Sequence, residues 1–86
     1  MRYARIDTLR QLSDLLGQIR LKPGIEEKRT GIFYRNSRSF LHFHEDPAAV
    51  FADISRGKGS DFDRYPVNTI EQRKMLLAAI DRALNE

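Results

Sequence analysis

The sequence contains no cysteine, and this absence excludes several kinds of chemistry at once. There can be no disulfide, no thiol nucleophile and no zinc site built from thiolates. Long apolar runs are missing too, since none approaches the ~20 residues that a membrane-spanning helix needs. The first residues carry charges in place of the apolar segment of a secretory signal. We therefore expect a cytoplasmic protein with no disulfide framework and no membrane contact.

The sequence also lacks a strong excess of charge of one sign. Its 15 basic and 12 acidic residues give a formal net charge of +3. Between residues 21 and 68 there are eight basic and seven acidic residues, and the excess lies at Arg2, Arg5 and Arg10. Interspersed charge of this kind is typical of a solvated surface. We expect no strong nucleic-acid binding, and weak binding through these three arginines stays as an alternative.

A chain of 86 residues can bury one modest hydrophobic core, so we expect a single domain over residues 1–86. Residues 8–20 are predicted to form an amphipathic helix, because leucine and isoleucine recur there at helical spacing. A second helix is predicted after Thr69, where Gln72 completes a capping box. Its expected buried stripe is Ile70, Leu76, Leu77, Ile80, Ala83 and Leu84. The predicted core residues are Leu12, Leu15, Leu16, Leu41, Phe43, Leu77 and Ile80.

Four segments between the two helices are rich in aromatic and β-branched residues, which favour strands. They are residues 25–35, 39–44, 50–54 and 61–67. Asparagine tolerates the left-handed backbone of a two-residue turn, so a tight hairpin is expected at residues 36–37. Arg35 would then pair with Arg38, and Phe33 would lie opposite Phe40.

The connections after the hairpin are less regular. Residues 46–50 fit either a short turn or one helical turn, and we favour the turn. Residues 56–60 are rich in glycine but lack the ending of a phosphate-binding loop, so we expect a plain connection. The order of elements predicts an α+β domain with an N-terminal helix, an antiparallel meander of three to four strands and a C-terminal helix. We expect both helices to pack on one face of the sheet.

Both histidines of the chain lie in one apolar stretch, Phe40-Leu41-His42-Phe43-His44-Glu45-Asp46. Alternate side chains of a strand point to the same face. His42 and His44 are therefore expected on one face beside Phe40. We further predict that Asp53 lies in the same polar patch as the two histidines. An arginine is expected to border this patch, and Arg38 is the arginine we choose. A nearby carboxylate would raise the pKa of at least one histidine.

Three kinds of chemistry fit such a pair. Two imidazoles and a carboxylate from Asp53 could hold a divalent transition metal ion. Imidazole is also the usual proton carrier near neutral pH, but the sequence shows no partner nucleophile for His42 or His44. The third reading is structural, with both rings half-buried and hydrogen-bonded to neighbours.

Residues 31–54 carry a family resemblance. The motifs are Phe40-Leu41-His42-Phe43-His44-Glu45-Asp46 and Phe51-Ala52-Asp53-Ile54, preceded by Arg38. This pattern resembles small bacterial proteins of unknown function, and residues 62–69 fit it as well. More loosely it is similar to the luciferase-like domain family, which has an arginine, two alternate histidines and a later Ala-Asp. The resemblance implies no activity, but it groups Arg38, His42, His44 and Asp53 as one constellation.

Taken together, these patterns favour a non-enzymatic binding or interaction module without a cofactor. Its expected ligand-binding residues are Arg38, Phe40, His42, His44 and Asp53. The alternative is a small metal-binding protein that uses His42, His44 and Asp53 as ligands. A protein or small molecule would be the partner, and a homodimer is compatible with the sequence.

Overall fold

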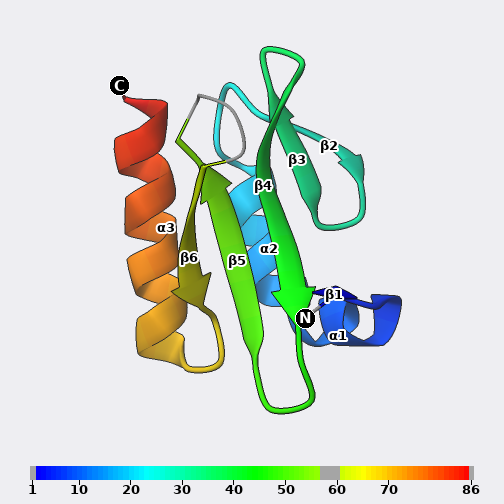
Figure 1. The fold of residues 1–86 in the computed structure, drawn as a ribbon. Helices are drawn as coiled ribbons and strands as arrows, with labels where there is room; N and C mark the ends of the chain where they lie inside the picture. Colours follow the sequence, from blue (N-terminus) through cyan, green and yellow to red (C-terminus); the bar gives the residue numbers. More distant parts are fainter. Residues whose placement is uncertain (1, 57–60, 86) are drawn as a thin grey trace.

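The computed structural model describes residues 2–56 and 61–85, which form one six-stranded antiparallel sheet and three helices (Figure 1). The elements in chain order are β1 (Arg2–Tyr3), α1 (Ile6–Gln11), α2 (Ser13–Arg20), β2 (Glu26–Arg29), β3 (Ile32–Arg35), β4 (Arg38–Glu45), β5 (Val50–Ser55), β6 (Phe62–Pro66) and α3 (Ile70–Leu84). The α+β class and the antiparallel sheet are confirmed. The predicted number of strands is too low.

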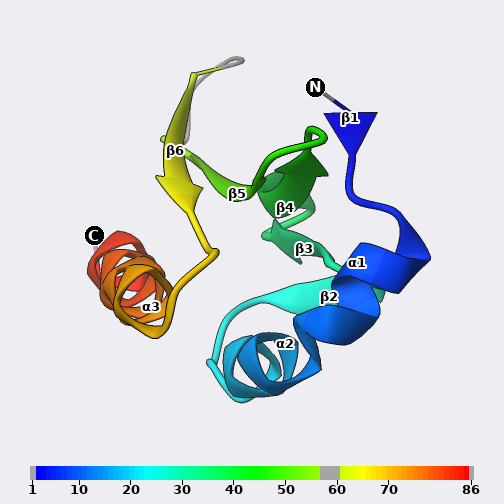
Figure 2. The same ribbon diagram turned by 90° about the horizontal axis from the view of Figure 1, so that it is seen from below.

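The sheet has the strand order β2-β3-β4-β5-β6, and β1 pairs with the far end of β4. Figure 2 shows α2 and α3 on the same side of this sheet. The core consists of Leu9, Leu12, Leu15, Leu16, Ile19, Phe33, Phe40, Leu41, Phe43, Ala52, Ile54, Val67, Leu76, Ala79 and Ile80. The opposite side of the sheet, which we call the open face, is turned away from both helices. No helix in the described part of the chain has the length and apolar character needed to cross a membrane.

The predicted helix over residues 8–20 is interrupted at Leu12. Helix α1 begins earlier, at Ile6, and Leu12 separates it from α2. The Leu12 N–H bonds to the Leu9 carbonyl at 3.0 Å, three residues back, which is the tight spacing of a 3₁₀ turn. The two helices therefore run in different directions (Figure 2). Leu12 itself is buried, so the bend keeps its side chain in the core.

The predicted strand over residues 25–35 is two strands, β2 and β3, joined by a turn at Gly31. Gly31 has a φ of 77°, a conformation that L side chains rarely adopt. Its N–H donates to the Glu27 carboxylate at 2.9 Å. A Cβ at this position would lie 2.8 Å from the Leu9 side chain. The glycine thus allows the chain to reverse close against α1.

The hairpin at residues 36–37 has the predicted turn, since both residues have positive φ and Arg35 pairs with Arg38. Its register farther along is different. Phe33 lies opposite Leu41 rather than Phe40, because a β-bulge adds one residue to β4 at this point. The bulge moves Phe40 from the predicted histidine face into the hydrophobic core.

One further strand and two connections remain to be compared with the prediction. Strand β1 is missing from the prediction, because two residues are too few to show a pattern. Residues 46–49 form a turn in which the Asp46 carboxylate accepts the N–H groups of Ala48 and Ala49, both at 2.8 Å. In the predicted connection at 56–60, residues 57–60 lie outside the described part.

Helix α3 has the predicted capping box. The Gln72 N–H donates to the Thr69 hydroxyl at 3.1 Å, and the Gln72 side chain accepts from the Thr69 N–H at 3.2 Å. The buried face of α3 is rotated relative to the predicted one. Leu76 is fully buried, whereas Leu77 is half-buried and Ile70 is exposed. Leu76, Ala79 and Ile80 face the core.

This rotation can be tested with two neighbouring substitutions. We expect Leu76→Ala to lower the free energy of unfolding by about 2–5 kcal/mol, as buried leucine truncations do. Leu77→Ala is the matched control and should cost clearly less, because its side chain is only partly buried. Urea denaturation of both variants measures the difference. Equal losses would contradict the observed orientation of α3.

Candidate functional site

A cluster of four polar side chains occupies the open face, and we call it the histidine patch: His42, His44, Asp53 and Arg64. Strand pairing brings it together, because His42 lies opposite Asp53 on β5 and Asp53 lies opposite Arg64 on β6. His44 stands two residues along β4, on the same face as His42. The rings of the two histidines meet edge to face with centroids 4.7 Å apart.

The Asp53 carboxylate is the centre of the histidine patch. Its side chain is only 4% exposed. Arg64 binds it with two hydrogen bonds, from Nε to Oδ1 at 2.8 Å and from Nη2 to Oδ2 at 2.9 Å. Burial raises the pKa of the Asp53 carboxyl, but the hydrogen bonds from Arg64 and His44 outweigh it and hold the pKa below its ordinary value. The carboxylate is therefore ionised at neutral pH.

His44 is oriented by this carboxylate. Its Nδ1 lies 2.9 Å from Oδ2 of Asp53. A carboxylate can only accept, so Nδ1 carries the proton of this bond, and in the neutral ring Nε2 is left as an acceptor. The Tyr3 ring stacks on His44 with a centroid distance of 4.7 Å. Strand β1 thus covers one side of the imidazole.

His42 is less well satisfied than His44. Its Nε2 lies 3.6 Å from Oδ2 of Asp53, which is too long for a hydrogen bond. Its Nδ1 is buried and has no hydrogen-bond partner among the described residues. Phe62 and Tyr3 contact the ring edge to face, with centroids at 4.8 and 5.4 Å. The ring is held by aromatic packing more than by polar bonds.

The expected rise in histidine pKa is wrong for His42. Burial lowers the pKa of His42, and the charges of His44 and Arg64 act in the same direction. The negative charge of Asp53 raises the pKa of His42, but its effect is too small to reverse the shift. The prediction considered only the carboxylate and left out the burial of the ring, which is the largest cause of the lowered pKa. His42 is therefore a neutral ring in the folded protein near pH 7.

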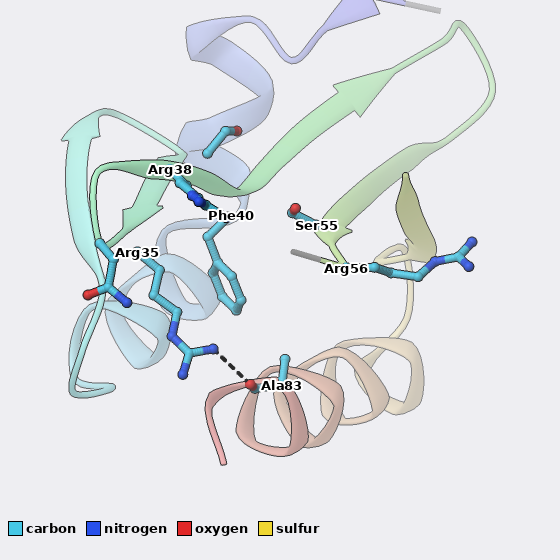
Figure 3. A pocket seen from close by; sticks show the side chains of 8 residues that line it. Arg35, Arg38, Phe40, Ser55, Arg56 and Ala83 are labelled. Atoms are coloured by element: carbon cyan, nitrogen blue, oxygen red, sulfur yellow. Dashed lines mark hydrogen bonds between the residues drawn. The ribbon is translucent and has the colours of Figure 1, made fainter. Parts of the chain in front are cut away.

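The predicted site residues are divided between two places. His42, His44 and Asp53 come together in the histidine patch, as the strand alternation implies. Arg38 and Phe40 instead line a cleft of about 490 Å³ between the β3–β4 hairpin and the end of α3. In Figure 3 the Phe40 ring points toward the helix that carries Ala83.

The same cleft is closed at its helix end by Arg35. Its guanidinium donates to the carbonyl group of Ala83 at 2.9 Å (Figure 3) and to that of Leu84 at 3.3 Å. These carbonyls belong to the last turn of α3, where positive charge is favourable. Arg35 therefore joins the hairpin to the last turn of the helix.

The sequence prediction missed Arg64, Tyr3 and Phe62. Arg64 and Phe62 alternate on the predicted fourth strand, which is a usable signal for a shared face. The register that places Arg64 opposite Asp53 could not be read, because a long connection joins β5 to β6 and no turn type fixes the pairing. Tyr3 reaches the histidine patch through the pairing of β1 with β4, in which it lies opposite His44. The two residues are far apart in the sequence, so no local pattern indicates this pairing.

The chain was compared with protein-family models, curated proteins and solved structures, and none of them matches.

The histidine patch is suited chemically to binding a cation. One donor atom from each of His42, His44 and Asp53 can be chosen so that all three lie within 4.8 Å of one another. Two donors of one tetrahedral zinc ion are separated by about 3.4 Å when the bonds are near 2.1 Å. The separations of 2.9 and 3.6 Å from Oδ2 of Asp53 to Nδ1 of His44 and Nε2 of His42 bracket that value, and a metal ion bound there would replace the proton on Nδ1 of His44.

The lowered pKa of His42 predicts a loss of stability in mild acid. Its ordinary pKa is 6.5, and the folded value lies below this. The unfolded chain therefore binds more protons than the folded protein between the two values. The free energy of unfolding should be full above about pH 6.5 and should fall as the pH drops toward the folded pKa. Asp53 adds a similar loss only at lower pH, below its ordinary pKa of 3.8.

Urea denaturation between pH 7 and pH 5, in the presence of a chelator, measures this loss. His42→Gln removes the titrating ring, so its stability should change less with pH than that of the original protein. Equal slopes in the two proteins would contradict a neutral, buried His42.

Proposed function

We propose that this protein is a non-enzymatic binding module and that the histidine patch binds a divalent transition metal ion. The observation that carries the proposal is the convergence of two imidazoles and one carboxylate, from His42, His44 and Asp53, within 4.8 Å. Imidazole nitrogen and carboxylate oxygen are the ligands preferred by zinc and neighbouring metals. A mixed set of this kind suits these ions better than calcium or magnesium, which prefer oxygen alone.

The placement of the three ligands supports this proposal. His42 and His44 belong to β4, Asp53 belongs to β5, and both strands lie inside the sheet rather than at its edge. Ligands on such strands are held more rigidly than ligands on loops, so little ordering entropy is lost on binding.

Binding, rather than catalysis, is the simplest use of the histidine patch. The chain has no thiol nucleophile, since it has no cysteine. Both imidazoles are committed to packing contacts with aromatic rings. The pKa of Asp53 lies below its ordinary value, so the carboxylate is a weak general base at neutral pH.

Titration with zinc sulfate in a non-coordinating buffer, followed by calorimetry, tests the proposal. We expect one zinc ion per chain, and at least a roughly tenfold loss of affinity in His44→Gln and in Asp53→Asn. Asp63→Asn is the matched control: its carboxylate lies on β6 and pairs with Arg56, outside the histidine patch. It should bind zinc like the original protein.

Two results would refute metal binding at this site. One is an absence of zinc binding to the original protein at neutral pH. The other is zinc binding that Asp53→Asn and Asp63→Asn weaken to the same extent, since that would locate the ion at general surface charge.

A protein contact on the open face is the second candidate, and the exposure of Tyr3 favours it. Tyr3 is 60% exposed, while Phe51 and Phe62 are half-buried on neighbouring strands. Aromatic rings beside a polar cluster are typical of interaction surfaces. A second copy of the chain is one such partner, and light scattering during gel filtration would show its molar mass. A monomer at high concentration would oppose this form of the contact.

Nucleic-acid binding has less support from the described residues. Arg2 lies 3.7 Å from the Glu45 carboxylate, and Arg10 lies 3.8 Å from Asp7. Two of the three N-terminal arginines thus have acidic neighbours, which weakens their pull on phosphate.

A further inference from the structure

We infer that Arg64 is a displaceable internal cation, and that a divalent metal ion enters the histidine patch by replacing it on Asp53. The inference rests on the proposed metal binding and names the residue that regulates it. Arg64 is not one of the three ligands. Its guanidinium occupies the carboxylate that the metal ion would need.

The first argument is competition for one oxygen atom. Oδ2 of Asp53 accepts from Nη2 of Arg64 and from Nδ1 of His44, both at 2.9 Å, and Nε2 of His42 lies 3.6 Å away. A metal ion bound between the imidazoles and Oδ2 would take the place of the proton on Nδ1 of His44 and would meet the guanidinium at the same oxygen atom. It would also place two positive charges a few ångströms apart, which is strongly unfavourable at a half-buried site.

The second argument is the contrast in freedom between the two partners. Asp53 is buried on an inner strand, whereas Arg64 lies on the edge strand β6 with its side chain 49% exposed. The arginine can therefore turn toward solvent with little loss of packing, while the carboxylate cannot follow it. In the bound position the guanidinium carbon lies 5.9 Å from the centroid of the Phe51 ring, at the limit of a cation–π contact, so little attraction is lost on release.

The third argument concerns charge balance. A buried carboxylate needs a counter-charge, and leaving it unpaired is costly. Arg64 supplies that charge in the metal-free protein, and a metal ion would supply it in the bound form. Asp53 is thus neutralised in both states, so exchange of one cation for the other is feasible without unfolding the sheet.

Zinc titration of Arg64→Gln by calorimetry tests the exchange. Removing the competing cation should raise the zinc affinity about tenfold over the original protein. Arg56→Gln is the matched control, because it removes the same charge from an exposed pair with Asp63. Its zinc affinity should stay within about twofold of the original, since distant exposed charges are screened by salt. Circular dichroism first establishes that both variants are folded.

A second measurement covers the case in which Arg64→Gln does not fold. The Nε–H of Arg64 donates to Oδ1 of Asp53, so its resonance in the NMR spectrum of the original protein reports on that bond. Added zinc should shift this resonance and increase its exchange with water, while the Nε–H of Arg73, bonded to the Val67 carbonyl, stays unchanged.

The outcomes separate the inference from the proposed function. If the original protein binds zinc but Arg64→Gln binds it no more tightly, or the Arg64 resonance does not move, the exchange is wrong and metal binding stands. If neither protein binds zinc, both the exchange and the proposed function are wrong. Tighter binding by Arg64→Gln alone, with Arg56→Gln unchanged, supports both.

Discussion

The buried carboxylate of Asp53 is the constraint on which the open face of the sheet depends. An ionised group at the middle of a sheet is stable only with a counter-charge and satisfied oxygen atoms. Arg64 supplies the charge and one donor for each oxygen, and His44 supplies a further donor. These bonds decide which nitrogen of His44 carries the proton. Burial of the His42 ring, together with the charges of His44 and Arg64, favours its neutral form against the pull of this carboxylate.

The bulge at Phe40 lets one strand serve both sides of the sheet. Without it, strict alternation would place Phe40 on the open face with His42 and His44. The extra residue allows Phe40 and Leu41 to join the core in succession, after which the alternation resumes. Strand β4 therefore fills the core near the end of α3 and still presents both imidazoles to the other side. The bulge separates the cleft lined by Arg38 from the histidine patch.

Local patterns predicted the elements that depend on local geometry. The turn at residues 36–37, the capping box at Thr69 and the shared face of His42 and His44 each follow from a few neighbouring residues. The position of Arg64 opposite Asp53 depends on the register of two strands joined by a long connection, which no local pattern contains. The same applies to the bulge at Phe40, which nothing in the residue types announces. The choice between Leu76 and Leu77 needed the angle at which α3 meets the sheet, and adjacent leucines leave that angle open.

The division of residues between inner strands and an edge strand gives the histidine patch its chemical character. The three possible metal ligands lie on inner strands, where backbone bonds on both sides limit their movement. The arginine that neutralises the carboxylate lies on the edge, where half of its side chain meets water. A tighter arginine would stabilise the fold further but would close the carboxylate to any other cation. An absent arginine would leave a buried charge unpaired. A half-exposed arginine on an edge strand satisfies the carboxylate in the free protein and can still give way to a cation of higher charge.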